Sequence, residues 1–180
     1  MSWFGRVQEE FCPLVLPFAG KPIQYVEIGV WTGNSARYVC ENVLTHPDAR
    51  GVGIDHYPPD HKRTQAETFA IRDEAARNLA PFPKWQFIYE PSQTALRKWD
   101  GPIDLLYIDG DHNAPGALGD FCLAWPFLTP GAVVIFDDYG IGKKYRSPHV
   151  PAAVEAVKIA FGKKVQVILD GAWQFAFRVT

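Results

Sequence analysis

Three aspartates follow two apolar runs of the chain, and their side chains are well suited to binding a cation. Asp109 follows the run at residues 103–108, and the pair Asp137 and Asp138 follows the run at 132–136. Predominantly apolar runs of this length are typical of buried parallel strands. Ligands bind to an open parallel sheet at the carboxyl ends of its strands, so we expect the three carboxylates to share one site. Because crowded carboxylates repel one another, the pattern predicts a divalent cation with oxygen ligands, such as Mg²⁺ or Ca²⁺.

His112 lies three residues after Asp109. Histidine titrates near neutral pH, so His112 could remove a proton from an acceptor held at the cation. Asp109 or water is the alternative base, and a hydrogen bond at the start of the next helix is the alternative role for His112. We expect Asp111 to cap that helix rather than to bind metal. Asp138 could be solvated, with Asp109 and Asp137 alone binding the cation.

A glycine-containing loop follows the first predicted strand. Gly29 and Gly33 allow the backbone to approach a ligand closely, and the next helix offers free N–H groups. Their spacing is not the G-x-G-x-x-G of dinucleotide-binding proteins, and Glu27 would repel a phosphate but suit a cationic ligand. Asp55 ends the second predicted strand, the position from which a carboxylate accepts hydrogen bonds from ribose hydroxyls.

The rest of the chain alternates apolar strands with amphipathic helices, which is typical of an α/β protein. Parallel strands are expected at 24–28, 51–55, 85–89, 103–109 and 132–137. Helices are expected at 35–44, 63–79, just after Pro91, 114–125 and 150–161, with Asn34 or Ser35 and Ser92 as N-caps. Two further strands, 164–169 and 172–179, flank Asp170-Gly171, a strong signal for a tight hairpin turn. The predicted fold is a Rossmann-like, doubly wound sheet of seven strands, mostly parallel with a C-terminal antiparallel hairpin.

The composition is that of a folded protein without strong attraction to polyanions. The 180 residues carry a formal net charge of −2 and 47% are hydrophobic, which argues against disorder and against nucleic-acid binding. No apolar run approaches the roughly 20 residues of a membrane span, and the N-terminus lacks the pattern of a signal peptide. Cys12, Cys40 and Cys122 form neither a disulfide nor a metal-binding pattern, which suggests reduced thiols in a cytoplasmic protein. We expect one domain over residues 1–180, with residues 1–22 as a short lead-in.

Together these motifs resemble class I S-adenosylmethionine-dependent methyltransferases, and most closely their metal-dependent O-methyltransferases. That subgroup includes enzymes that act on sugar hydroxyls of macrolides and other natural products. The resemblance covers nearly the whole chain from Gln24 onward. It rests on the terminal hairpin and on four motifs: Glu27-x-Gly29-x-x-x-Gly33-x-Ser35, Gly53-Ile54-Asp55, Tyr107-Ile108-Asp109-Gly110-Asp111-His112 and the segment from Leu128 to Asp137-Asp138-Tyr139.

The resemblance implies a role for each matched residue. The methionine part of the cofactor would lie against Glu27, Gly29 and Gly33, the ribose against Asp55 and the adenine near Ser92. Ser35 and Asp109 would complete the set of cofactor-binding residues. The metal ligands would be Asp109, Asp137 and Asp138, and the catalytic base would be His112 or Asp109.

The implied reaction is metal-assisted transfer of a methyl group to a hydroxyl of a small molecule or glycoside. The cation, Mg²⁺ or another divalent ion, would orient the acceptor and lower its pKa. Members of the subgroup carry a longer N-terminal extension or lid, so the acceptor pocket is expected to be open or completed by another subunit of a homo-oligomer. Two rivals remain: a nicotinamide-dependent oxidoreductase, against which Glu27 argues, and a non-catalytic cofactor-binding module, which would tolerate loss of Asp137 or His112.

Overall fold

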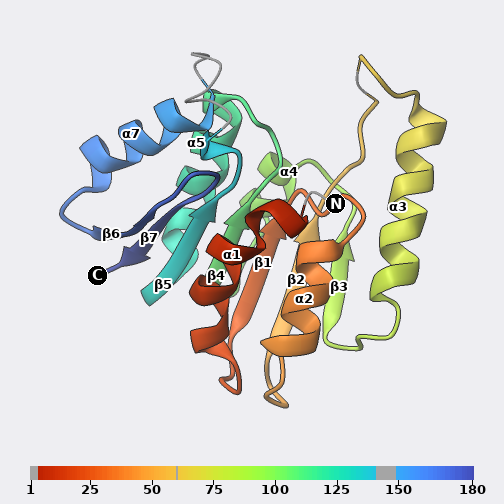
Figure 1. Ribbon diagram of the computed structural model, residues 1–180, viewed down its shortest axis with the longest axis horizontal. Helices are drawn as coiled ribbons and strands as arrows, with labels where there is room; N and C mark the ends of the chain where they lie inside the picture. The colour runs from red at the N-terminus through yellow and green to blue at the C-terminus, as the bar shows by residue number, and fades with distance from the viewer. Residues whose placement is uncertain (1–3, 60, 141–148) are drawn as a thin grey trace.

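A mixed sheet of seven strands forms the centre of the structure, which is a computed structural model describing residues 4–59, 61–140 and 149–180. The strands are β1 (Gln24–Ile28), β2 (Arg50–Ile54), β3 (Trp85–Ile88), β4 (Ile103–Ile108), β5 (Leu128–Phe136), β6 (Val165–Asp170) and β7 (Phe175–Val179). They lie in the order β3-β2-β1-β4-β5-β7-β6 (Figure 1). The first five are parallel, and β7 runs antiparallel to both β5 and β6. The predicted fold class is confirmed.

Helices cover both faces of this sheet. They are α1 (Phe4–Val15), α2 (Asn34–Asn42), α3 (Gln65–Leu79), α4 (Ser92–Arg97), α5 (Ala114–Ala124) and α7 (Val150–Phe161), with 3₁₀ turns at Leu16–Phe18 and Trp125–Phe127. In Figure 1, α1 and α2 lie in front of the sheet, α4 and α5 lie behind it, and α3 lies beside the edge strand β3. No helix in the described part of the chain is long and apolar enough to cross a membrane.

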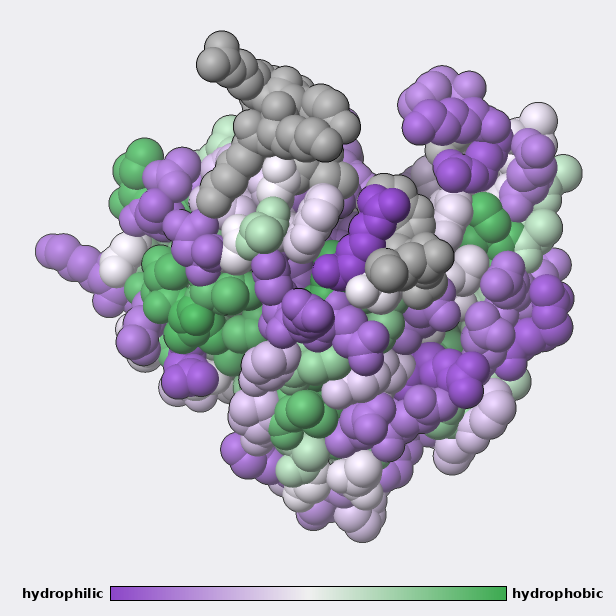
Figure 2. All heavy atoms as spheres, viewed as in Figure 1, coloured by the Kyte–Doolittle hydropathy of each residue, from purple (hydrophilic) through white to green (hydrophobic). Residues whose placement is uncertain are grey.

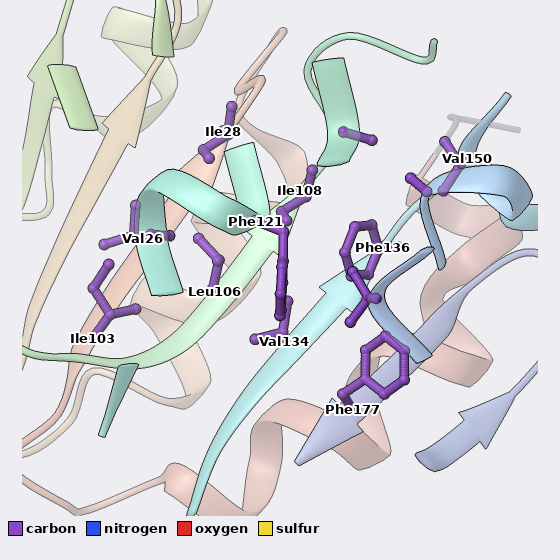
Figure 3. Packing of buried hydrophobic residues seen from close by; sticks show 14 of the residues in the cluster. Val26, Ile28, Ile103, Leu106, Ile108, Phe121, Val134, Phe136, Val150 and Phe177 are labelled. Carbon is purple, nitrogen blue, oxygen red and sulfur yellow. The ribbon is translucent and has the colours of Figure 1, made fainter. Parts of the chain in front are cut away.

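Strand β4 is buried on both faces from Leu105 to Ile108, as its predominantly apolar sequence predicts. Ile108 belongs to the cluster beneath α5, where the ring of Phe121 lies 5.9 Å from that of Phe136 (Figure 3). Tyr107 belongs to the cluster on the opposite face, where its ring lies 4.9 Å from that of Phe11 in α1. Burying a large apolar side chain stabilises a fold by roughly 1.5–3 kcal/mol. Packing on both faces therefore holds the end of β4 firmly, together with the residues that follow it.

The outer strand β6 is less covered than the central strands. Val167 is 45% exposed. In Figure 2 hydrophobic side chains gather at the left of the view, over β6 and β7, whereas hydrophilic ones dominate over α2 and α3. The candidate site instead lies at the carboxyl ends of the central strands β1, β4 and β5.

The C-terminal hairpin has a longer turn than the sequence predicts. Strand β6 continues through Asp170 and β7 begins only at Phe175, so residues 171–174 form the turn. The Gly171 N–H donates to the Gln174 carbonyl at 2.9 Å and closes it. The next three amides donate to Glu10 of α1. The prediction of a two-residue turn is wrong because a carboxylate distant in sequence binds these amides.

Strand β5 begins earlier than predicted. Leu128 pairs with Ile103, and the register then shifts before Val133 pairs with Leu105. Residues 129–131 belong to the strand, although Pro130 and Gly131 are typical turn residues. The irregular pairing accommodates Pro130, which has no N–H to offer a regular ladder.

Two helices begin differently from the prediction. Gly33, with a φ of 80°, is the N-cap of α2, and Pro91 is the N-cap of α4. Asn34, Ser35 and Ser92 are not N-caps. The hydroxyls of Ser35 and Ser92 instead donate hydrogen bonds to buried carboxylates. A buried carboxylate without a donor costs more free energy than an uncapped helix end, because water can hydrogen-bond to the helix end.

Candidate active site

The loop between β1 and α2 lies directly against the end of β4. Gly29 has a φ of 84°, and a Cβ at this position would lie 2.1 Å from the carbonyl oxygen of Asp109. The Asp109 amide in turn donates to the carbonyl of Ile28 at 2.8 Å. Only glycine can provide both this conformation and this close approach. The glycine loop and Asp109 therefore form one continuous surface at the carboxyl edge of the sheet.

Glu27 is fully buried beneath this loop. Its two carboxyl oxygens accept hydrogen bonds from the Tyr25 hydroxyl at 2.7 Å and the Ser35 hydroxyl at 2.5 Å. Burial raises the pKa of Glu27 to about 8, although both hydrogen bonds act in the opposite direction. The carboxyl is thus largely neutral at pH 7, and a positive charge placed nearby would favour its ionised form.

Asp55 holds the glycine loop from the end of β2. Its Oδ2 accepts the amides of Val30 at 2.9 Å and Trp31 at 3.2 Å, and its Oδ1 accepts the amide of Tyr57 at 2.9 Å. Trp31 has a φ of 53°, which is uncommon for a bulky residue. A carboxylate has about four acceptor positions, so Asp55 can still accept a hydrogen bond from a ligand hydroxyl.

Asp109, His112 and Asp138 converge beyond the ends of β4 and β5. One ligand atom from each lies within 4.8 Å of the others. His112 Nδ1 contacts Asp138 Oδ2, and this hydrogen bond raises the pKa of His112 above its ordinary value. Asp138 has a φ of 56°. Strained backbone of this kind is often found at functional sites, where it aims a side chain.

Asp137 has different hydrogen-bond partners from Asp138. Its Oδ1 accepts a hydrogen bond from Gln174 Nε2 at 3.1 Å, and the Tyr107 hydroxyl also bonds to its carboxyl group. Burial and the neighbouring Asp138 raise the pKa of Asp137 to about 6. The side chain of Asp137 also hydrogen-bonds to that of Asp109, so Asp137 adjoins the group of three.

The electrostatics of this cluster suit a divalent cation. Burial, followed by the charges of Asp137 and Asp138, raises the pKa of Asp109 well above its ordinary value. A bound cation would relieve this repulsion and restore the ionised carboxylates. Two carboxylates with an imidazole suit Mn²⁺ or Zn²⁺ as well as Mg²⁺, which prefers oxygen ligands. The residues present therefore fit a metal ion.

Asp111 lies on the helix side of this cluster. Its Oδ1 accepts the amide of Asn113 at 3.0 Å, and Asn113 is the N-cap of α5. Both residues precede the helix on the exposed surface. Asp111 is therefore not the N-cap that the sequence predicts, but it holds the N-cap residue Asn113.

Ser92 belongs to a polar pair that the sequence does not reveal. Its hydroxyl donates to Oδ1 of Asp120 in α5 at 2.6 Å. Asp120 is fully buried, its pKa is raised to about 6 by burial, and its Oδ2 has no hydrogen-bond partner among the described residues. A Cβ on Gly110 would lie 3.8 Å from that oxygen. The pair therefore connects the segments that follow β3 and β4.

A weak signal for Asp120 is present in the sequence. It lies at helical spacing with Ala117, Phe121 and Ala124, so a carboxylate occupies the buried face of a predicted helix. Charged residues on such a face are rare unless they have a specific partner. Gln174 offers no comparable signal, because a single polar residue beside a strand is common.

The matched family agrees with this geometry. Residues 26–139 match the family described as "Methyltransferase domain". The match spans the glycine loop, Asp55, Asp109 and both aspartates after β5, and it covers more than half of the chain. The chain belongs to this methyltransferase family, and its recognition as a methyltransferase from sequence motifs is confirmed.

The individual proteins to which the chain is similar have low sequence identity to it. The chain is 27% identical over 145 residues to "Uncharacterized protein R132" of Acanthamoeba polyphaga mimivirus. The aligned region covers 78% of this chain but only 61% of that protein. Among solved structures, the O-methyltransferase TomG from Streptomyces achromogenes, in complex with SAM, has a TM-score of 0.64 and 20% identity over 100% of this chain and 82% of its own. An O-methyltransferase from Bacillus cereus, in complex with SAH, has a TM-score of 0.67 and 17% identity over 100% and 82%. These structures share the fold of this chain.

Proposed function

We propose that this protein transfers a methyl group from S-adenosylmethionine to a hydroxyl of a small molecule or glycoside, with the help of a divalent cation. The observation that carries the proposal is the position of Asp109, which touches the glycine loop at Gly29 and also belongs to the cluster with His112 and Asp138. A cofactor on the loop and an acceptor at the cluster would therefore be neighbours. The O-methyltransferases of similar fold, one in complex with SAM, support this choice of cofactor and acceptor.

The residues that we propose for cofactor binding lie on and around the glycine loop. Gly29 and Gly33 let the methionine part approach the backbone, above Glu27 and Ser35. Asp55 accepts hydrogen bonds from the ribose, and Ser92 lies on the side of the adenine. Glu27 acts from beneath the loop, where its carboxyl favours the positive groups of the cofactor over a phosphate.

Proton removal is assigned to His112. Its Nδ1 bonds to Asp138, which orients the ring and leaves Nε2 to accept the proton of the acceptor hydroxyl. Asp109, Asp137 and Asp138 would hold the cation, for which we propose Mg²⁺ or another divalent ion. When bound, such an ion orients the acceptor oxygen and lowers its pKa. Asp109 is the alternative base.

We further propose that residues 1–180 act as one domain, in the cytoplasm, and that the acceptor pocket is either open or completed by a second copy of the chain. The three cysteines are free thiols, which agrees with a reducing compartment.

Calorimetric titration with S-adenosylhomocysteine tests the proposal, with and without Mg²⁺ and with NAD as the competing ligand. We expect binding of S-adenosylhomocysteine, no binding of NAD, and a separate heat of Mg²⁺ binding. Tight binding of NAD without affinity for S-adenosylhomocysteine would contradict the proposed cofactor. Methyl transfer at the same rate with and without metal would contradict the role of the cation.

A further inference from the structure

Glu10 of α1 binds the turn between β6 and β7. Its carboxylate accepts the amide of Ala172 at 2.7 Å, that of Trp173 at 3.2 and 3.3 Å, and that of Gln174 at 2.8 Å. A Cβ on Gly171 would lie 2.2 Å from Glu10 Oε2, so the carboxylate is seated closely in the turn. Three successive amides directed at one anion form a concave site for negative charge. The N-terminal helix and the C-terminal hairpin are thereby joined.

The same turn packs against the loop that carries the candidate metal ligands. The Gly140 amide donates to the Trp173 carbonyl at 3.3 Å. A Cβ on Gly140 would lie only 1.6 Å from the carbonyl oxygen of Ala172. The turn therefore cannot shift toward this loop without displacing it, and the loop begins with Asp137 and Asp138.

Gln174 links the turn to one of these aspartates. Its side chain is fully buried, and its Nε2 donates to Asp137 Oδ1 at 3.1 Å and to the Tyr107 hydroxyl at 3.2 Å. The backbone amide of the same residue is the one held by Glu10 at 2.8 Å. The backbone amide of Gln174 is thus bound by Glu10 of α1, and its side chain donates to the carboxylate of Asp137.

We propose that Glu10 is a positioning residue for the cation site, acting through Gln174 on Asp137. This inference rests on the proposed function, because it takes Asp137 to belong to that site. Strand pairing does not hold Gln174, because the pairing of β7 with β5 and β6 begins only at Phe175. Glu10 determines the path of the turn between the strands, and hence where the Gln174 side chain begins.

Direct measurement of Mn²⁺ binding tests this inference without relying on activity. Free Mn²⁺ is counted by electron paramagnetic resonance in wild type, Glu10→Gln, Gln174→Leu and the double variant. Loss of a residue that supports a metal ligand commonly weakens metal binding by about 10–100-fold, which is the expectation for Gln174→Leu. For Glu10→Gln, one step further away, we expect a loss of roughly 3–10-fold. The double variant should bind no more weakly than Gln174→Leu alone, because both changes break the same connection.

Glu9→Gln is the matched control, because Glu9 is the neighbouring residue on the same helix and is exposed. It should bind Mn²⁺ as the wild type does. S-adenosylhomocysteine affinity and melting temperature are measured on the same samples, and in Glu10→Gln the cofactor affinity should stay within about twofold of wild type while metal affinity falls.

Three outcomes would overturn the inference. If Glu10→Gln binds Mn²⁺ like the wild type, Glu10 does not act on the site. If metal affinity, cofactor affinity and melting temperature all fall together, Glu10 supports the fold as a whole. If the wild type binds no Mn²⁺, the cation part of the proposed function fails, and the inference fails with it.

Discussion

Ser92 and Asp120 are joined by a hydrogen bond of 2.6 Å that connects the segment after β3 to α5. The donor is the serine hydroxyl, so the oxygen of Ser92 keeps its lone pairs for a ligand. The other oxygen of Asp120 has no partner among the described residues. A fully buried carboxyl group with one unpaired oxygen prefers its protonated form.

Asp120→Asn should therefore change how stability depends on pH. The pKa of Asp120 is raised from 3.8 to about 6, so the folded protein retains a proton there that the unfolded chain has lost. Wild-type stability falls as pH rises through this window, and the asparagine variant lacks that contribution. From pH 4 to pH 7 the variant should gain about 1–3 kcal/mol relative to wild type. Urea unfolding at several pH values measures this, and parallel curves would contradict the prediction.

Glu27 should release a proton when the cofactor binds. Its pKa of about 8 in the free protein means that it is largely protonated at pH 7. The positive groups of S-adenosylmethionine would lower that pKa, as would the ammonium group of S-adenosylhomocysteine. Calorimetry in buffers of different ionisation enthalpy should detect release of up to about one proton per site. Glu27→Gln should release none, and a wild type that releases none would place the carboxyl outside the influence of the cofactor.

Asp137→Asn combined with Asp138→Asn should abolish metal binding and metal-dependent turnover. The change removes charge with little change in volume, so the fold and the affinity for S-adenosylhomocysteine should be retained. Because the pKa of Asp137 is about 6, wild-type metal affinity should also rise with pH through that value as protons leave. Titration of Mg²⁺ between pH 5 and pH 8 checks both points. Asp100→Asn, on the exposed surface, is the control and should behave as wild type.

His112→Ala should lower kcat by roughly 10²–10⁴-fold, the usual cost of losing an acid–base group, without weakening cofactor binding. In the wild type, activity should rise with pH through a value above the ordinary histidine pKa, because Asp138 raises the pKa of His112. In the metal-free protein, Asp138→Asn should lower the pKa of His112, which NMR titration of the imidazole measures. His61→Ala, an exposed histidine, serves as control. Near-normal turnover of His112→Ala with the same pH profile would make Asp109 or water the base.

The strands and the candidate site were accessible to sequence reasoning because both depend on local signals. An apolar run such as 103–108 identifies its own strand, and the residue after it must lie at the carboxyl edge of a parallel sheet. The contacts of Ser92, Ser35 and Glu10 were not accessible in this way. Each of these side chains binds a partner on another element, and in each case a local expectation of a helix cap or a tight turn gave way to that tertiary bond.

The position of β7 has a consequence for the order in which the fold is completed. β7 follows β6 in the chain but lies between β5 and β6 in the sheet, so β6 contacts the sheet only through β7. During synthesis β6 therefore has no strand to pair with until residues 175–179 have also emerged. Until then the open side of β5 is an unpaired edge, a type of surface prone to wrong partners. Substitutions that weaken β7 should consequently reduce the yield of folded protein more than similar substitutions in the outer strand β3.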